Sequence, residues 1–425
     1  MKEIRYERLN ETLWLSQLDN GLSIYVLPKK GFNKKYAFFA ANYGGCDMRF
    51  ISDGKLMDTP AGIAHYLEHK MFDMPYGSAM NRLTENGASP NAFTSYGITG
   101  YLFSCTDGFE TNLRTLLEYV TTPYFTEESV EKERGIIGQE IRMGEDNPSR
   151  AVLTELLKAL YRTHPVREQI AGTLDSIALI DAETLCACHK KFYNPANMVL
   201  CCSGDVEPGA VEDIAAELVT APRGERYVRD FGQSDGLLPD RVKNVREMPV
   251  GMPIFMTGSK MEYRAGKDGI RRLITAQLGC DLLMGASSPL YADMYASGLI
   301  NSSFYSGIMD FPEGAAAIAG GMCAQPGEVM ARICTAAEAL EAGAEERQRF
   351  DRLKKAMLGA LLSELDSPEE LCHIHAERHF DGFMPLEQME MVEGIEPEEA
   401  VAIVREQFAA ERLAMSEIVP PEGRN

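Results

Sequence analysis

The sequence lacks an excess of positive charge. Its 42 Lys and Arg are outnumbered by 63 Asp and Glu, which leaves a net charge of −21 over 425 residues. Nucleic acids require clustered Lys and Arg against their phosphates, and anionic membrane surfaces attract the same side chains, so the composition argues against both classes of partner. An acidic chain favours basic substrates instead. We therefore expect neither nucleic acid nor membrane among its partners.

Long apolar runs and a disulfide framework are also missing. No stretch reaches the roughly 20 apolar residues that cross a bilayer, and the opening residues, MKEIRYE, contain no apolar core of a secretory leader. The ten cysteines follow no framework spacing, as is usual for proteins of a reducing compartment. We therefore expect a cytoplasmic protein.

Apolar runs and helical patterns alternate along the chain, which predicts α/β or α+β layers. The predicted strands are 22–27, 36–41, 92–94, 100–104, 198–203, 253–256 and 315–323, and the predicted helices are 61–71, 111–120, 127–143, 270–285 and 326–342. A chain of this length is too long for one hydrophobic core, so more than one domain is expected.

The stretch 221–245 is polar and rich in turn residues, so we place a linker there. It separates a predicted N-terminal domain, 1–220, from a predicted C-terminal domain, 246–425. The two halves share a weak similarity: the segment that begins at Asn91 and the segment that begins at Asn301 both precede an apolar strand. This similarity indicates distant repeats.

The sharpest motif is His65-Tyr66-Leu67-Glu68-His69. Positions i, i+3 and i+4 of a helix share one face, so both imidazoles can bind one Zn²⁺ with Glu68 beside it. A carboxylate there can take a proton from a water molecule that the metal activates. The alternative is a surface helix with two incidental histidines, but the small and apolar flanking residues favour a buried metal helix. The order reverses the His-Glu-x-x-His motif, which serves the same chemistry.

A catalytic zinc takes three protein ligands, so a further carboxylate or histidine is needed. Glu133 and Glu140 are seven residues apart and face the same side of a predicted helix, with Ile136 and Ile137 between them to seat that helix in the core. One carboxylate can ligate the metal, and the other can orient a histidine or the substrate amine. Without further information, a solvated charged face is the more common interpretation of such a pattern.

Several blocks resemble the motifs of the pitrilysin–insulinase–mitochondrial processing peptidase family, the inverzincins. The matching blocks are 61–72, 91–94, 133–140, 164–173 and 193–198, and the opening segments 20–22 and 27–34 resemble its YmfH-type bacterial branch. The resemblance implies one zinc per chain, held by His65, His69 and Glu140. It implies Glu68 as the catalytic base, Glu133 as a catalytic residue acting behind the ligands, and Asn91, Ala92, Phe93 and Thr94 as the strand that pairs with the substrate backbone.

The resemblance further implies an α+β fold of two homologous domains, each a mixed β-sheet flanked by helices, which together form half of a clamshell chamber. The implied activity is a zinc-dependent endopeptidase that cleaves peptides or small unfolded polypeptides inside that chamber. Active members carry an Arg and a Tyr where this chain has Ser297 and Asn301, with Tyr305 nearby. A homologous zinc-less partner subunit could supply both groups. The alternatives are a homodimer and, for function, a non-proteolytic assembly or maturation subunit that retains its zinc.

Three further histidines, His373, His375 and His379, lie close together near the C-terminus. His375 and His379 have helical i,i+4 spacing, but Glu377 between them points away from their shared face. A polar helix face is therefore the favoured interpretation over a second metal site.

Overall fold

The computed structural model describes residues 1–52, 54–225 and 227–421, which form two compact units. Unit 1 consists of Met1–Ile141, Gln169–Asp230 and Leu362–Leu386, whereas unit 2 consists of Arg142–Glu168, Phe231–Leu361 and the residues from Glu387 onward. One passage of the chain between the units, after Asp230, lies inside the expected linker 221–245. The division into domains 1–220 and 246–425 itself stays a prediction.

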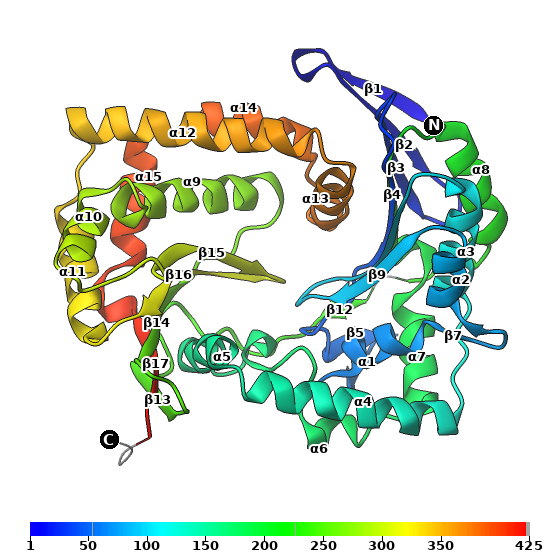
Figure 1. Cartoon of the computed structure of the whole chain (residues 1–425), viewed down its shortest axis with the longest axis horizontal. Helices are drawn as coiled ribbons and strands as arrows, with labels where there is room; N and C mark the ends of the chain where they lie inside the picture. Colours follow the sequence, from blue (N-terminus) through cyan, green and yellow to red (C-terminus); the bar gives the residue numbers. More distant parts are fainter. Residues whose placement is uncertain (53, 226, 422–425) are drawn as a thin grey trace. The chain divides into compact units, whose positions relative to one another are not determined.

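Unit 1 is built on a seven-stranded sheet with the order β1-β2-β3-β11-β4-β10-β9. Figure 1 labels β1, β2, β3, β4 and β9 of this sheet. β11 runs parallel to β3, and the other neighbours are antiparallel, so the sheet is mixed. The strands are β1 (Lys2–Tyr6), β2 (Glu11–Gln17), β3 (Ser23–Pro28), β4 (Lys35–Ala41), β9 (Ser89–Thr94), β10 (Thr99–Cys105) and β11 (Met198–Gly204). Two small sheets are formed by β5 (Arg49–Ser52), β6 (Lys55–Asp58) and β12 (Val228–Arg229), and by β7 (Asp73–Met74) and β8 (Gly77–Ser78).

The central strands of this sheet are buried on both faces. Along β4, Ala37 and Phe39 belong to one hydrophobic cluster, whereas Tyr36 and Phe38 belong to a second one. Successive side chains of a strand point to opposite faces, so a strand covered on both sides has a continuous apolar sequence. The helices of the unit are α1 (Ile63–Lys70), α2 (Ala79–Glu85), α3 (Phe109–Thr121), α4 (Glu127–Glu145, to Ile141 in this unit), α6 (Leu174–Ile177), α7 (Ala182–Phe192), α8 (Pro208–Leu218) and α13 (Pro368–Phe380).

Unit 2 repeats the same topology in five strands, in the order β13-β17-β14-β16-β15. β17 is parallel to β13, and the remaining pairs are antiparallel, as in the order β3-β11-β4-β10-β9 of unit 1. The predicted α+β class and the two mixed sheets are thereby confirmed. The strands are β13 (Lys243–Glu247), β14 (Ile254–Met261), β15 (Tyr305–Phe311), β16 (Gly314–Met322) and β17 (Ala414–Val419).

The helices of unit 2 are α5 (Pro148–Leu160), α9 (Gly266–Met284), α10 (Pro289–Ala296), α11 (Pro326–Ala339), α12 (Ala344–Glu364, to Leu361 in this unit), α14 (Gln388–Glu393) and α15 (Pro397–Gln407). The predicted helices near 270–285 and 326–342 correspond to α9 and α11. Among the helices that the structure describes, none combines the length and the apolar character that a bilayer crossing requires.

Each sheet is covered on one face by a helix from the other half of the sequence. α13 packs on β11, β4 and β3 of unit 1, and α5 packs on β17, β14 and β13 of unit 2. Both helices begin in the same way: Asn147 and Ser367 cap the first backbone N–H groups, and a proline follows at the first helical position. The two halves of the chain are therefore interleaved.

The segment that begins at Asn301 does not correspond to β9. Residues 301–304 lie before β15, and the edge strand of unit 2 begins only at Tyr305. The repeat is confirmed by topology, but the sequence similarity used to detect it was out of register. Edge strands carry few buried side chains, so their sequences constrain an alignment weakly.

A buried ion pair connects β12 with the loop after β4. Arg229 Nε donates to Asp47 Oδ1 at 2.7 Å, and Arg229 Nη2 donates to the side chain of Asn42 at 2.8 Å. The Asp47 side chain is fully buried and also accepts a backbone N–H from Gly44. The same loop contacts the β9–β10 turn, because Gly45 N–H donates to Ser95 O.

Replacing Arg229 by Met should therefore destabilise the protein by about 3–5 kcal/mol, because it leaves the buried Asp47 carboxylate without a cation beside it. Urea unfolding at neutral pH measures this loss. Arg114→Ala is the matched control, since Arg114 pairs with Glu217 on the surface, where both side chains are about half exposed, and should change stability by no more than about 0.5 kcal/mol. Equal effects of the two substitutions would contradict the prediction.

Candidate metal centre

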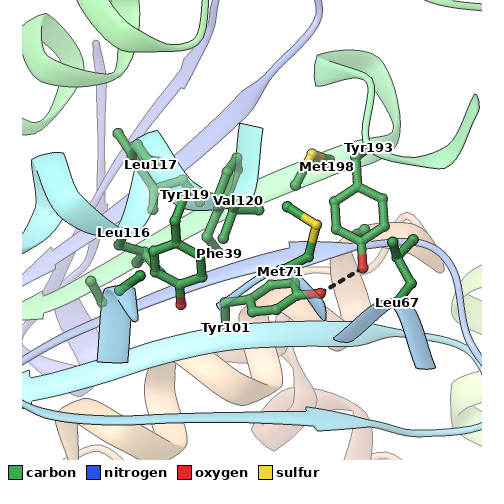
Figure 2. Close-up of a cluster of buried hydrophobic side chains, with 14 of the residues drawn as sticks. Phe39, Leu67, Met71, Tyr101, Leu116, Leu117, Tyr119, Val120, Tyr193 and Met198 are labelled. Atoms are coloured by element: carbon green, nitrogen blue, oxygen red, sulfur yellow. Dashed lines mark hydrogen bonds between the residues drawn. The ribbon is translucent and has the colours of Figure 1, made fainter. Parts of the chain in front are cut away.

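The short helix α1 has two chemically different faces. Leu67, and Met71 directly after the last helical residue, point into the core of unit 1, where they pack with Tyr101 and its neighbours (Figure 2). His65 and His69, one turn apart, lie on the other face and remain partly accessible. Because the apolar residues fix the rotation of the helix, the two imidazoles are presented together.

Helix α4 supplies two carboxylates to the same place. Ile137 is fully buried and seats the helix against the core of unit 1. Glu133 and Glu140, on the adjoining face, both reach the histidines of α1. Ile136 was expected to be buried as well, but it is 47% exposed. That expectation was wrong because Ile136 lies about 100° round the helix from Ile137, and the core of unit 1 covers α4 only on the side of Ile137.

Three ligand atoms converge between α1 and α4. The Nε2 atoms of His65 and His69 each lie 3.6 Å from Glu140 Oε2, and the three ligand atoms lie within 4.8 Å of one another. Ligands at about 2.1 Å from a tetrahedral zinc are about 3.4 Å apart, so the spacing suits that ion. It is the one group of His, Cys, Asp and Glu with metal-binding geometry in the described part of the chain.

Glu133 binds the other side of one of these histidines. His69 Nδ1 lies 2.9 Å from Glu133 Oε1, which directs His69 Nε2 toward Glu140. Burial alone would lower the pKa of His69, but the bond to Glu133 and the charges of the surrounding carboxylates raise it. The same bond lowers the pKa of Glu133. A carboxylate in this position fixes the tautomer and orientation of a metal-binding imidazole.

Glu68, between the two histidines in sequence, is only 8% exposed. Burial raises its pKa, and this rise is partly offset by a hydrogen bond that Thr94 Oγ1 donates to Glu68 Oε2 at 2.8 Å. Thr94 is the last residue of β9, so the bond joins the candidate base to the candidate substrate strand. The motif and the strand were each predicted, but this contact between them was not, because nothing in the sequence relates positions 26 residues apart.

β9 is an edge strand, and within the described residues it pairs with β10 alone. At the turn between them, Ser95 N–H donates to Ile98 O, which sets the alternation of the ladder. Phe93 therefore exchanges backbone hydrogen bonds with β10, whereas Ala92 and Thr94 turn their N–H and C=O groups to the open edge.

The side chains of this strand alternate between the two faces of the sheet. Ala92 and Thr94 lie on the face of α1, where Ala92 packs against the core and Thr94 reaches Glu68. Phe93 lies on the opposite face, in the cluster that contains α13, and Asn91 is exposed. The four residues predicted as a substrate strand therefore divide into outward-facing and inward-facing backbone positions.

Ser297 and Asn301 lie in unit 2, where both form local contacts. The Ser297 hydroxyl donates to Asp293 O at 2.9 Å at the end of α10. The Asn301 side-chain amide donates to Met322 O at 3.3 Å. The Tyr305 side chain, at the start of β15, is about half exposed. Neither Ser297 nor Asn301 carries the positive charge or the phenol of the expected Arg and Tyr.

A short helix that carries two histidines and a buried glutamate faces a second helix that carries a further carboxylate, in a chain with two similar mixed sheets. This arrangement is the one expected of an inverzincin. The family profile described as Insulinase (Peptidase family M16) matches residues 50–174, and the profile described as Peptidase M16 inactive domain matches residues 180–357. Over an alignment of 438 residues the chain is 35% identical to the "uncharacterized zinc protease YmfH" of Bacillus subtilis, with 99% of each chain covered. The chain belongs to peptidase family M16, the insulinase family, and within it to the YmfH-type branch.

Solved structures share this architecture. An M16-like peptidase from Alicyclobacillus acidocaldarius has a TM-score of 0.91 at 30% identity, covering 97% of this chain and 99% of that one. A protease from Helicobacter pylori has the same fold, with a TM-score of 0.82 at 18% identity over 96% of this chain and 99% of that one. The periplasmic protease PqqL of Escherichia coli has a TM-score of 0.72 at 16% identity, and the match covers 99% of this chain but 48% of PqqL.

The bond between His69 and Glu133 should make the stability of the metal-free protein depend on pH. A raised His69 pKa contributes stability below the unfolded value and loses it as pH rises through the folded value. A lowered Glu133 pKa contributes stability above its unfolded value and loses it as pH falls. Both contributions are present at about pH 5.5 and that of His69 is lost at about pH 9.

Glu133→Gln should therefore cost the metal-free protein about 1–2 kcal/mol more at about pH 5.5 than at about pH 9. Urea unfolding in the presence of a chelator measures the difference. Glu131→Gln, which removes an exposed carboxylate from the same helix, is the control and should show no such dependence. A pH-independent loss in Glu133→Gln would mean that the two side chains are not ion-paired.

Proposed function

We propose that this chain is a zinc-dependent endopeptidase that cleaves peptides or small unfolded polypeptides. The observation that carries the proposal is the hydrogen bond between Thr94 of the edge strand and Glu68. This bond joins a strand that can accept a peptide to a buried carboxylate, and that carboxylate lies next to the candidate metal ligands His65, His69 and Glu140. The names of relatives such as the zinc protease YmfH support the same activity.

His65, His69 and Glu140 are the proposed ligands of one zinc ion per chain. Two imidazoles and one carboxylate leave one coordination position open, as in hydrolytic zinc sites. When bound, zinc would supply Lewis-acid polarisation of the scissile carbonyl and of the attacking water. Glu133 holds His69 in the orientation that ligation requires.

Glu68 is the proposed proton carrier. As a carboxylate it would accept a proton from the attacking water and then deliver it to the nitrogen of the leaving amine. Its burial supports this role, because a raised pKa brings a carboxyl group closer to the pH at which the protonated and ionised forms are both accessible. The Thr94 hydroxyl would hold the carboxylate in place during both transfers.

The proposed peptide site is the open edge of β9. A substrate in extended conformation would add to the sheet by bonding the outward backbone groups of Ala92 and Thr94, in the manner of β-strand addition. The corresponding edge in unit 2 offers a contrast. There Ile308 N–H, on β15, donates to the side chain of Gln277 of α9 at 3.1 Å, which occupies a position that a peptide would need.

We further propose that a homologous partner subunit completes the site. Ser297 and Asn301 stand where the family pattern has an Arg and a Tyr, so this chain lacks groups that would stabilise charge on the scissile carbonyl. The match with less than half of PqqL supports pairing, because that chain has room for a second unit of this kind. A heterodimer meets both requirements, whereas a homodimer would still lack the Arg and the Tyr. The cytoplasmic location stays a prediction.

Zinc dependence is the first test of this function. Removal of metal by a chelator should abolish peptide cleavage, and Zn²⁺ should restore it. Glu68→Gln should keep its zinc and lose about 10²–10⁴-fold in kcat, because the proton acceptor is gone while the ligands remain. Glu140→Gln should lose zinc, and Glu133→Ala should bind it about 10–100-fold more weakly. Metal analysis and peptide kinetics measure these effects.

Glu131→Gln serves as the matched control on α4 and should leave both zinc content and turnover unchanged. A fully active Glu68→Gln protein would eliminate the proposed mechanism. Normal zinc content in Glu140→Gln would move the third ligand to another residue. A protein that binds zinc but cleaves no peptide, with or without a partner, would instead favour the assembly subunit.

The partner requirement gives a second test. The isolated chain should bind zinc normally and cleave peptides poorly. A homologous chain that lacks the zinc motif but carries the Arg and Tyr should raise turnover by about 10²–10³-fold, the usual effect of restoring a transition-state oxyanion donor. Replacing that Arg or Tyr in the partner by Ala should reverse the gain. Equal turnover of the isolated chain and the mixture would refute the heterodimer and point to Tyr305 as the alternative donor.

A further inference from the structure

Helix α13 carries three of the seven histidines, and it is not a polar surface helix. His375 is 1% exposed, and its Nδ1 bonds Leu371 O at 2.7 Å within the helix. His379 Nδ1 bonds the hydroxyl of Tyr25, on β3, at 2.9 Å. The expected polar face was wrong, because this face covers the aromatic side of the unit 1 sheet.

His373, one turn from the start of the helix, contacts the rear of the edge strand. Its ring is stacked on Phe38 at 4.4 Å between centroids and on Phe93 at 5.5 Å, with interplanar angles of 15° and 13°. Its Nε2 lies 2.8 Å from the hydroxyl of Tyr36. Burial lowers the pKa of His373, which disfavours the charged form of its ring.

A glycine makes this cluster possible. Phe93 pairs with Gly100 across β9 and β10. A Cβ atom at Gly100 would lie 2.0 Å from the ring of Phe38, so the missing side chain lets that ring lie over β10. Phe38, which belongs to β4, thereby reaches Phe93 on the far side of β10, at 5.7 Å between ring centroids.

The two faces of β9 therefore make different contacts. On one face Thr94 binds Glu68, and on the other Phe93 is held by a ring from α13. An edge strand has one neighbour and is more prone to fraying than a central strand. A peptide that adds to its open edge pairs more weakly if the strand must first be ordered, because that ordering opposes binding.

We propose that His373 is a positioning residue for peptide binding: by stacking on Phe93 from the second half of the chain, it holds β9 in the conformation to which a substrate strand adds. This inference rests on the proposed peptide site at β9. The residues immediately before and after the unit 1 segment Leu362–Leu386 belong to unit 2. Part of the peptide site is thus supported by residues that the N-terminal half of the chain does not contain.

The test uses zinc-loaded protein that carries Glu68→Gln to prevent turnover, and a fluorescein-labelled, unstructured basic peptide of 15 residues. In this background His373→Ala should weaken peptide binding by about three- to tenfold, the range expected for one lost ring stack. Hydrogen–deuterium exchange of segment 89–98 should become faster without peptide. His373→Phe keeps a ring and should bind within about twofold of the parent protein.

His379→Ala is the matched control, because it removes an equivalent anchor of the same helix to β3 instead of β9. It should leave both peptide affinity and exchange of segment 89–98 unchanged. Unchanged affinity in His373→Ala, or an equal loss in His379→Ala, would overturn the inference. If peptide does not slow hydrogen–deuterium exchange of segment 89–98 in the parent protein, the proposed peptide site itself is overturned. This outcome is measured before any histidine is replaced.

Discussion

The fold depends on burying both faces of two mixed sheets. The central strands β4 and β11 have no polar face, so the hydrophobic effect requires a layer of helices on each side. In unit 1, one layer comes from the surrounding sequence and the other from α13, 160 residues or more downstream of the last strand in the sheet. In unit 2, α5 has the same task.

The candidate metal centre follows from how this core fixes two helices. α1 is anchored by Leu67 and Met71, and α4 by Ile137, so the polar faces of both helices are directed at the same point. The ligand atoms already lie close together in the structure. The hydrogen bond to Glu133 also fixes the orientation of the His69 ring. Preorganisation of this kind is what a hydrolytic site requires, because side-chain ordering then costs little when metal and substrate bind.

The two sheets differ at the edges formed by β9 in unit 1 and β15 in unit 2. Among the described residues, no strand pairs with the outer edge of β9, where the backbone groups of Ala92 and Thr94 face outward, whereas the outward N–H of Ile308 on β15 donates to the side chain of Gln277. An open edge invites pairing with any extended chain, and proteins usually block it. Keeping one edge open and capping the other is consistent with a single peptide site beside the metal cluster. The stack of His373 on Phe93 then offsets the weakness of an edge strand that must stay unpaired.

Sequence patterns predicted several local elements, among them α1, α4 and β4, but not α5, and the proposed ligand set of the centre came from the resemblance to a family. Periodicity located strands, helices and the histidine pair on α1, because the alternation of apolar residues records which face of an element is buried. It could not determine what covers that face, since α5 and α13 would show the same pattern against either sheet. The contact of Thr94 with Glu68, the exposure of Ile136, the cap of Gln277 and the burial of His375 were decided only by tertiary packing. Such contacts depend on the path of the chain, and a side chain's partner far along the sequence leaves no periodic signal at its own position.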